Sequence, residues 1–599
     1  MTSYAKALSL LTSSERRRGA LVLLMVVVMA VLETAGVASV LPFLAVLGNP
    51  EIVEDNPIFT ALYAKFGSGS VDDFLFMLGA TSFAIIIFAA GFRIVTVFAM
   101  NQYTQLRRHS IGERLLETYL RQPYSFYLNR HSSDLAKNIL SEVDQLVAHV
   151  FKPAFEVLAY SFVVAMLVTL LLIVDPKLAL TIGLVIGGVY LLVFLTVKGV
   201  LGRIGRERVH ANRLRFGTAG EALAGIKDIK LFGREHAYLA RFRTPSRLFA
   251  EYQATNLTLS AVPKYVIEAV AFGGLLLLSL FLMSTTDGVG DVLPVLGLYA
   301  FAGYRLLPAA QYIYAGCANL RFGVAAIDAV FDDLELRASM AEISSDVTER
   351  LIPTNAIEMI DVTFTYPNAS EAAVTNMNLT IPVGTSVGLV GTTGAGKTTM
   401  VDLILGLLHP TSGRIAVDGF EIDEFRRRSW QKSLGYVPQN IFMIDASVSE
   451  NIAFGVPQQH VDTMAVEQCA RLAQVHDFVV TALPLGYETK IGERGVRLSG
   501  GQRQRIGIAR ALYHDPAVLV FDEATSALDI ATEKSVMSAI HAIKGSKTVI
   551  LIAHRITTVR ECDMIVLLDH GTTRAAGTYD ELMAGSPDFR AIAGVAVET

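Results

Sequence analysis

Cysteine and tryptophan are scarce in this chain of 599 residues, which contains three cysteines and one tryptophan. The spacing of Cys317, Cys469 and Cys562 fits neither a zinc site nor a disulfide framework, so a reducing compartment suits the part of the chain outside a membrane. An excess of charge of one sign is also lacking, because the formal net charge is only -5. This small charge argues against a general nucleic-acid binder.

Apolar residues, in contrast, are abundant and unevenly distributed. They make up 52% of the chain, which is high for a soluble enzyme, and they are concentrated before about residue 322. The chain is also too long for a single hydrophobic core. We therefore expect a membrane domain at 19–322 and a soluble domain after it.

The long apolar runs predict six transmembrane helices, at 20–47, 74–100, 145–174, 178–200, 252–284 and 290–322. The first run continues well beyond the roughly 7–15 apolar residues of a signal peptide, so we expect it to be retained. The segment 1–18 before it predicts an interfacial helix. Basic residues gather at the N-terminus and in the two long segments after the second and fourth spans, and the positive-inside rule places these in the cytoplasm.

Both long basic segments show near-helical apolar spacing, which predicts that membrane helices continue into the cytoplasm. Each segment must reverse direction, and the candidate turns lie near 122–130 and 232–238. These turns either only connect helices or contact the soluble domain. We favour the second interpretation, because helices that project this far are expected to end in contact with another part of the protein. Residues 323–352 predict a linker, and the alternating strand-like and helical runs of 353–599 predict an α/β domain.

The strongest chemical signal is a glycine-rich segment between a short apolar run and a helix-like run. It reads Gly391-Thr392-Thr393-Gly394-Ala395-Gly396-Lys397-Thr398, followed by Thr399. This order of strand, loop and helix is that of a phosphate-binding P-loop, in which backbone N–H groups converge on an anion. Lys397 can reach the outer phosphates and the Thr398 hydroxyl can bind Mg²⁺. The alternative is a chance glycine-rich turn.

A second apolar strand, 518–522, ends in an acid and is followed by another. Asp522 is suited to hold Mg²⁺ through water beside Thr398. Glu523 can accept a proton from an attacking water, although an acid at a helix start is also favourable for dipole reasons alone.

A second anion site is predicted upstream, at the segment Leu498-Ser499-Gly500-Gly501-Gln502, which precedes a helical run. A hydroxyl and glycines at the start of a helix favour the binding of an anion. Two phosphate-binding helix starts of one chain cannot both contact the same nucleotide. We therefore expect two domains facing head to tail, each ATP lying between one chain's P-loop and the other chain's Ser499 region.

Together these motifs resemble those of ATP-binding cassette (ABC) transporters, and the resemblance covers essentially the whole chain. It implies that Tyr366 stacks on adenine, although a strand aromatic in the core is the alternative, and that Gln439 touches Mg²⁺ and the transmembrane interface. It further implies that His554 acts at the γ-phosphate, that Asp529 couples two sites, and that residues 492–495 form an exporter-type X-loop.

The implied architecture is a six-helix membrane domain of the type I exporter, or type IV transporter, fold, followed by an α/β P-loop nucleotide-binding domain. The implied activity is ATP hydrolysis, with Mg²⁺, coupled to transport. One membrane domain and one cassette per chain suggest a homodimer, with a heterodimer as the alternative. Soluble ABC ATPases lack six spans, and Glu523 and His554 disfavour a channel that is merely gated by ATP.

Ionisable residues inside the apolar runs bear on the cargo. Arg93, Lys264 and Arg305 could line a cavity and attract an anionic headgroup. Alternatively, Glu33 or Glu268 pairs with a cation and holds helices together.

Three short membrane stretches, 32–36, 42–43 and 304–308, resemble bacterial flippases of the lipid-linked oligosaccharides used in protein glycosylation. This resemblance implies a multi-pass protein of the bacterial inner membrane with its nucleotide-binding domain in the cytoplasm. It implies transport of a lipid-linked oligosaccharide from the inner to the outer leaflet, with a lipid A-type or multidrug exporter as the alternative.

Overall fold

The computed structural model describes residues 2–48, 50, 53, 57–66, 70–174, 176–285, 293–336, 349–523, 533, 547–553 and 555–594. The chain divides into two compact units. Residues 1–122 and 130–340 form the first, and residues 123–129 and 341–599 form the second. The predicted turn near 122–130 therefore groups with the nucleotide-binding half of the chain.

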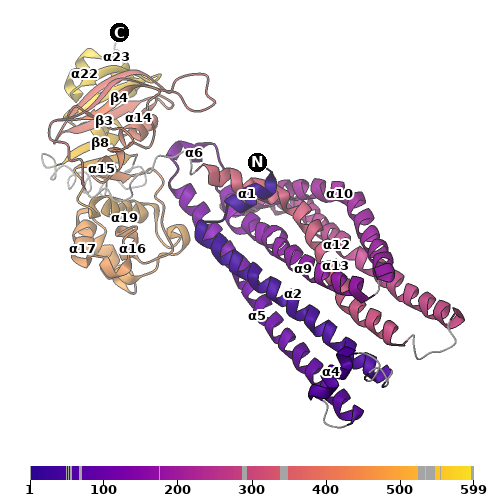
Figure 1. Ribbon diagram of the computed structural model, residues 1–599. Helices are drawn as coiled ribbons and strands as arrows, with labels where there is room; N and C mark the ends of the chain where they lie inside the picture. Colours follow the sequence, from indigo (N-terminus) through magenta and orange to yellow (C-terminus); the bar gives the residue numbers. More distant parts are fainter. Residues whose placement is uncertain are drawn as a thin grey trace. The chain divides into compact units, whose positions relative to one another are not determined.

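The described part of the first unit is helical (Figure 1). Its long helices are α2 (Ser13–Gly48), α5 (Val71–Leu120), α9 (Lys152–Val174), α10 (Pro176–Ala224), α12 (Glu235–Thr285) and α13 (Leu293–Glu335). Its shorter helices are α1 (Ser3–Ser9), α4 (Pro57–Phe66), α7 (Ser132–Lys137), α8 (Val143–Leu146) and α11 (Ile226–Leu231). Between them, Gly233 takes a left-handed conformation with φ 61° where the chain reverses before α12.

These helices are long because they continue past the membrane. The 50 residues of α5 extend about 75 Å, more than twice the roughly 30 Å hydrocarbon core of a bilayer. Within the described residues, five stretches are long and apolar enough to cross a membrane: Ser13–Gly48, Val71–Leu120, Ser132–Ile173, Ile186–Ala224 and Leu306–Glu335. The predicted span 252–284 lies in α12, and several side chains there are outside the description.

Two predicted boundaries differ from the structure. The expected interfacial helix 1–18 is instead the short α1 followed by the first turns of α2, which begins at Ser13. The expected linker 323–352 begins with helix, because α13 runs to Glu335. Its side chains Ile327, Val330 and Leu334 recur at helical spacing and are buried, so packing extends this helix beyond the apolar run.

The third membrane helix departs from regular α-helix on its approach to the membrane. Two π-helical segments, Asn138–Glu142 and Val147–Phe151, flank α8 and lead into α9. Glu142 is fully buried in the first of them.

The second unit contains α6 (Tyr124–Leu128) and two sheets. The four-stranded sheet is antiparallel in the order β2 (Val374–Pro382), β1 (Ala356–Phe364), β4 (Ser412–Val417) and β5 (Phe420–Glu421). The six-stranded sheet has the order β10 (Thr572–Gly577), β9 (Met564–Asp569), β3 (Ser386–Gly391), β8 (Thr548–Ile552), β7 (Val518–Asp522) and β6 (Leu434–Val437). All neighbouring pairs in it are parallel except β10 with β9.

The helices of the described part of this unit, besides α6, are α14 (Lys397–Ile404), α15 (Arg427–Gln431), α16 (Val448–Ile452), α17 (Thr463–Leu472), α18 (His476–Ala482), α19 (Gly500–Tyr513), α21 (Ile556–Val559), α22 (Tyr579–Gly585) and α23 (Pro587–Ile592). Among them, α14 and α19 pack against the strands of the six-stranded sheet. The central strands β3, β7 and β8 are buried on both sides, as their continuous apolar sequences require.

Successive strand residues alternate between two hydrophobic cores. Val518 and Val520 of β7 pack in one core with residues of α14, including Met400. Leu519 and Phe521 pack in the other core with residues of α19, including Ile506. Because side chains of a strand alternate between faces, α14 and α19 lie on opposite faces of the sheet.

Candidate functional site

The P-loop residues Gly391–Thr398 connect β3 to α14, as the glycine-rich pattern predicts. Gly396 has φ 92°, and a Cβ there would lie 2.6 Å from the Ala373 carbonyl oxygen. Gly394, with φ 84°, also takes the left-handed conformation. The loop therefore needs glycine for backbone conformation at both positions, and at Gly396 also for close approach.

Lys397 is buried at the start of α14 and folds back over the loop. Its Nζ donates to the carbonyl oxygens of Gly391 and Thr392, each at 2.9 Å. Burial lowers its pKa, while the nearby carboxylates of Glu523 and Asp522 raise it. Thr398 is exposed one residue later, so its hydroxyl is accessible to a ligand.

The acidic side of the site stands at the carboxyl ends of β7 and β6. Asp522 ends β7, is 6% exposed and accepts a hydrogen bond of 3.4 Å from the Tyr436 hydroxyl. Burial and the Asp522 charge both raise the pKa of Tyr436, which keeps its phenol protonated. Gln439, just after β6, donates from Nε2 to Glu523 Oε2 at 2.7 Å.

Glu523 has φ 51°, an uncommon conformation for a residue with a side chain. Its N–H donates to the Ile552 carbonyl oxygen at 3.2 Å, which ties this turn to the end of β8. The structure thus brings together Lys397, Gln439, Asp522 and Glu523, although nearly 130 residues separate the first from the last. An exposed hydroxyl, a carboxylate and an amide are hard oxygen donors, which fit Mg²⁺.

Sequence reasoning missed Asp402, which lies on α14 close to this acidic cluster. Burial and the Asp522 charge raise its pKa from the usual 3.8 to about 6. Its position in an ordinary helical run gave no signal, because the shift depends on burial in the folded protein and on Asp522, 120 residues later.

Tyr366 lies beyond the end of β1, and its ring contacts Phe364 edge-on with 5.0 Å between centroids. Its hydroxyl and the Thr399 Oγ1 are 3.0 Å apart, a hydrogen bond that joins it to the P-loop helix. The ring is half-buried and packs beside the core that contains α14. This position is compatible with both the adenine-stacking and the core interpretation.

Ser499 caps α19 in a reciprocal arrangement. Its Oγ accepts from the Gln502 N–H at 3.2 Å, and its own N–H donates to Gln502 Oε1 at 2.7 Å. Gly500 and Gly501 form the first turn of this helix. The residues of the second predicted anion site thus lie at the start of α19, on the face of the sheet opposite to α14.

Two predicted site residues, Asp529 and His554, lie outside the described residues. The strand that leads to His554, β8, lies between β3 and β7. In the predicted X-loop, Gly492 and Arg494 have positive φ values of 77° and 54°, and Arg503 donates to the Gly495 carbonyl oxygen at 3.4 Å.

The three predicted membrane cations have different surroundings. Arg93 Nη1 lies 3.2 Å from Glu33 Oε1, and Arg93 Nη2 lies 3.5 Å from the Tyr160 hydroxyl, so α2, α5 and α9 meet at one polar group. Lys264 Nζ lies 3.8 Å from Glu268 Oε1 on the same helix. The side chain of Arg305 is outside the description. At Arg93, this geometry favours the interhelical alternative over a free cavity cation.

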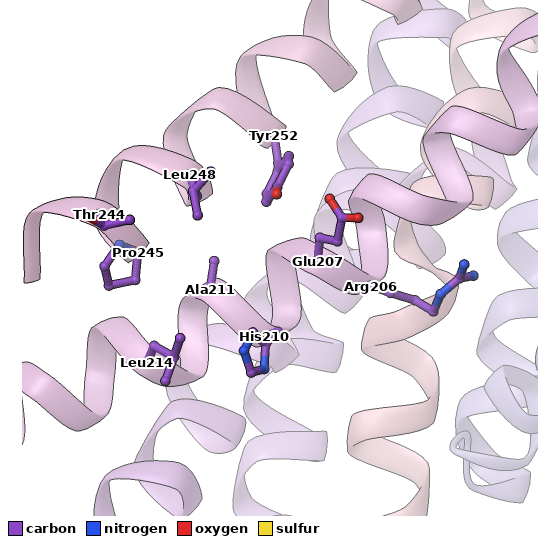
Figure 2. Close-up of a pocket in the computed structure, with 9 residues that line it drawn as sticks. All are labelled: Arg206, Glu207, His210, Ala211, Leu214, Thr244, Pro245, Leu248 and Tyr252. Atoms are coloured by element: carbon purple, nitrogen blue, oxygen red, sulfur yellow. The ribbon is translucent and has the colours of Figure 1, made fainter. Parts of the chain in front are cut away.

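Hollows also lie in the described part of the first unit, and two of them are near the long helices. One, of about 350 Å³, lies between the extensions of α10 and α12, where Figure 2 shows Leu248 and Tyr252 directed toward Ala211 and Glu207. The other, of about 360 Å³, is apolar and lies among α9, α10 and α13.

A helical unit with several membrane-crossing stretches and a P-loop unit on one chain define an ATP-driven membrane transporter. Comparison with known families agrees: residues 374–526 match the ABC transporter model, and residues 56–294 match the model of the ABC transporter transmembrane region.

Known proteins resemble the chain over most of its length. It is 31% identical over 502 residues to an ATP-dependent lipid A-core flippase of Saccharophagus degradans, covering 82% of this chain and 81% of that one. It is 29% identical to the putative multidrug export ATP-binding/permease protein YgaD of Bacillus subtilis, covering 79% and 81%.

A solved structure of a bacterial Atm1-family ABC exporter with ATP bound has the same fold, with a TM-score of 0.77, 22% identity, and 98% and 99% of the two chains covered. The chain belongs to the ABC transporter family. It is a multi-pass ATP-driven exporter, and the predicted fold class is confirmed.

Proposed function

We propose that two copies of this chain form a homodimeric lipid flippase with two composite ATP sites. The observation that supports the dimer is the placement of α14 and α19 on opposite faces of one sheet. A single nucleotide cannot contact both helix starts of one domain, so the Ser499 side of each site must come from another chain. Because one sequence supplies both halves, two identical chains complete two sites.

Within each site, the residues of the P-loop bind the phosphates and Tyr366 stacks on adenine. Thr398, Asp522 and Gln439 would hold Mg²⁺, which neutralises phosphate charge when it is bound. Glu523 accepts the proton of the attacking water, and its hydrogen bond with Gln439 orients the carboxylate. His554 acts at the γ-phosphate and Asp529 couples the two sites. The turns at 122–130 and 232–238 transmit closure to the membrane unit.

The composite site can be tested by complementation between two inactive chains. Lys397→Ala removes the phosphate-binding ammonium, and Gly501→Asp places an anion at the other half-site while remaining favourable at a helix start. The two variants, carrying different tags and purified as mixed dimers, should recover about half of wild-type ATPase activity, because each dimer holds one intact site of two.

The control places both substitutions on one chain paired with a wild-type chain. Both sites are then damaged, so activity should stay near background. Nucleotide trapping measured on the same samples separates loss of ATP binding from loss of turnover. Equal activity in the two arrangements would contradict a site shared between chains.

For the cargo, we propose a phosphate-bearing amphipathic lipid carried from the inner to the outer leaflet of a bacterial inner membrane, with the nucleotide-binding domain in the cytoplasm. The relatives named as lipid A-core flippases support a lipid A-like glycolipid at least as well as a lipid-linked oligosaccharide. Proteoliposomes that contain each lipid in turn distinguish the two by ATP-dependent exposure of the headgroup.

Glu523→Gln should abolish this flipping and keep ATP binding, since the amide retains an acceptor for Gln439 but is no base. Arg93→Ala, Lys264→Ala and Arg305→Ala test whether these cations line a cavity that attracts the anionic headgroup, with Arg93 the weakest candidate because it pairs with Glu33. Normal flipping in all three would exclude such a cation cavity.

A further inference from the structure

The apolar cavity among α9, α10 and α13 lies within the predicted membrane spans. Gly183 and Gly187 of α10 form part of its wall, and a Cβ built at either position would meet nothing within 4 Å. The absence of side chains at these positions opens the space. From Gly183 to Phe194 the lining extends about 17 Å along α10, at 1.5 Å per residue. On α13 the lining covers an equal length, from Leu306 to Cys317.

The wall offers almost nothing polar to a guest. Among the described residues that line it, the polar side-chain atoms are the hydroxyls of Tyr190 and Tyr314 and the thiol of Cys317. The Tyr190 hydroxyl donates to Gln311 Oε1 at 3.3 Å, and the Tyr314 hydroxyl donates to the Leu259 carbonyl oxygen at 3.1 Å. An apolar cavity of this kind suits an apolar guest and disfavours water. In a membrane, the apolar molecules around this cavity are the hydrocarbon chains of lipids.

Two cations continue the lining faces toward the cytoplasm. Lys198 follows Phe194 on α10, and Arg321 follows Cys317 on α13, each by four residues and so on the same helix face. Both are exposed, and Arg321 Nε donates to the Lys198 carbonyl oxygen at 3.3 Å. The guanidinium lies over Gly202, where a Cβ would be 3.0 Å from its Nε. A basic pair thus stands one turn beyond the end of the apolar cavity.

We propose that this cavity binds one acyl chain of an anionic phospholipid, whose headgroup carries a net negative charge and contacts Lys198 and Arg321. An acyl chain suits an apolar space of about 360 Å³ whose lining extends about 17 Å along membrane helices. Moving a chain from bilayer to protein gains little hydrophobic free energy, because both environments are apolar. Selection among lipids therefore rests on the headgroup. A headgroup with a net negative charge complements the two cations, whereas the phosphate of a zwitterionic headgroup is balanced by that headgroup's own cation.

The hollow of Figure 2 is less suited to an acyl chain than the apolar cavity. It lies beyond the predicted end of the fourth span, and its rim includes Arg206, Glu207 and His210. The lipid site stands whether or not the bound lipid is the cargo.

Photocross-linking of the full-length protein in lipid nanodiscs tests this site. The probes are phosphatidylglycerol and phosphatidylcholine with the same diazirine-bearing acyl chain, and mass spectrometry identifies the labelled peptides. We expect label on 183–194 and 306–317, with more from phosphatidylglycerol. Lys198→Gln and Arg321→Gln should each reduce phosphatidylglycerol labelling roughly fivefold and leave phosphatidylcholine labelling unchanged. Arg203→Gln, another exposed cation of α10, is the charge control.

Gly187→Phe should fill the cavity and reduce labelling by both lipids several-fold. Gly188→Phe is its matched control, because a Cβ there also meets nothing within 4 Å but the residue does not line the cavity. Gly183→Phe provides a second filling variant if Gly187→Phe does not fold. Equal labelling by the two lipids, or full labelling of a folded filling variant, would overturn the proposal. The assay uses neither ATP nor transport, so its failure would leave the proposed flippase function standing.

Discussion

The buried ion pair between Arg208 and Glu142 gives the sharpest energetic prediction for the membrane unit. Their side chains are 1% and 0% exposed, and Arg208 Nη2 lies 2.9 Å from Glu142 Oε2. Asn212 Nδ2 donates to the other carboxylate oxygen at 2.7 Å. The pair joins α10 to the π-helical segment Asn138–Glu142.

Replacing one partner leaves the other charge buried, and such a loss typically costs about 3–5 kcal/mol. The buried ammonium of Lys137 also lies near Glu142, so we expect Arg208→Met to cost about 3 kcal/mol, at the lower end. At roughly 2–4 °C per kcal/mol, the unfolding midpoint should fall by about 6–12 °C. The double variant Glu142→Gln with Arg208→Met removes both charges and should recover most of this loss.

Cys317 provides the assay, because it lies in the membrane unit while Cys469 and Cys562 lie in the other. With those two replaced by alanine, a thiol-reactive dye reports unfolding of the membrane unit in the full-length protein. Arg203→Met is the matched control, since its pair with Glu207 on the same helix is exposed and spans 3.9 Å. A shift no larger than that of the control, or a double variant as unstable as the sum of the single variants, would refute the reasoning.

Three predictions concern the nucleotide-binding unit, whose unfolding can be followed by the single, fully buried Trp430. The raised pKa of Asp402 means that the folded state binds its proton more tightly, so stability should fall as pH rises from about 4 to about 6, by up to about 3 kcal/mol; Asp402→Asn should remove most of that fall in Trp430 fluorescence titrations. Gly396→Ala should weaken ATP binding at least about tenfold, because the added Cβ would lie too close to the Ala373 carbonyl oxygen. At Gly394 a Cβ would meet nothing within 4 Å, so Gly394→Ala should lower only the free energy of unfolding, by the roughly 1–2 kcal/mol of a left-handed conformation. Calorimetry measures the ATP affinity of both variants, and Trp430 fluorescence measures their unfolding. If Tyr366 stacks on adenine, alanine there should lose about 1–3 kcal/mol of ATP affinity in calorimetry while phenylalanine loses little.

The sequence was most informative where chemistry depends on neighbours in the chain. The P-loop needs only a strand, glycines, a lysine and a helix start in order, and Gly391–Thr398 has that order in the structure. The lengths of the membrane helices likewise follow from local apolar runs and their periodic continuation. The fold class was predictable for the same reason.

Pairings between distant segments were not predictable. Arg93 and Glu33 are 60 residues apart in sequence, and only the packing of α5 against α2 determines that they pair. The π-helical segments before α9 have no recognised sequence signal, and the end of α13 is set by burial of Ile327 and Leu334 against other elements. The elevated pKa of Asp402 depends in the same way on tertiary structure, through burial and then through Asp522 at the end of a strand that follows much later.

The strand order explains why some site residues meet within one chain, and it supports the proposal that the Ser499 half of each site comes from a second chain. The P-loop, Gln439 and Glu523 follow β3, β6 and β7, whose carboxyl ends lie along one edge of the parallel sheet. Ser499 starts a helix on the face opposite to α14, so no rearrangement of loops at that edge can bring it over the same phosphates. In the proposed dimer, Gly501→Asp should therefore impair the ATP site that contains the partner chain's P-loop, and should leave the site that contains its own P-loop intact. Complementation between two inactive chains is the measurement that decides this.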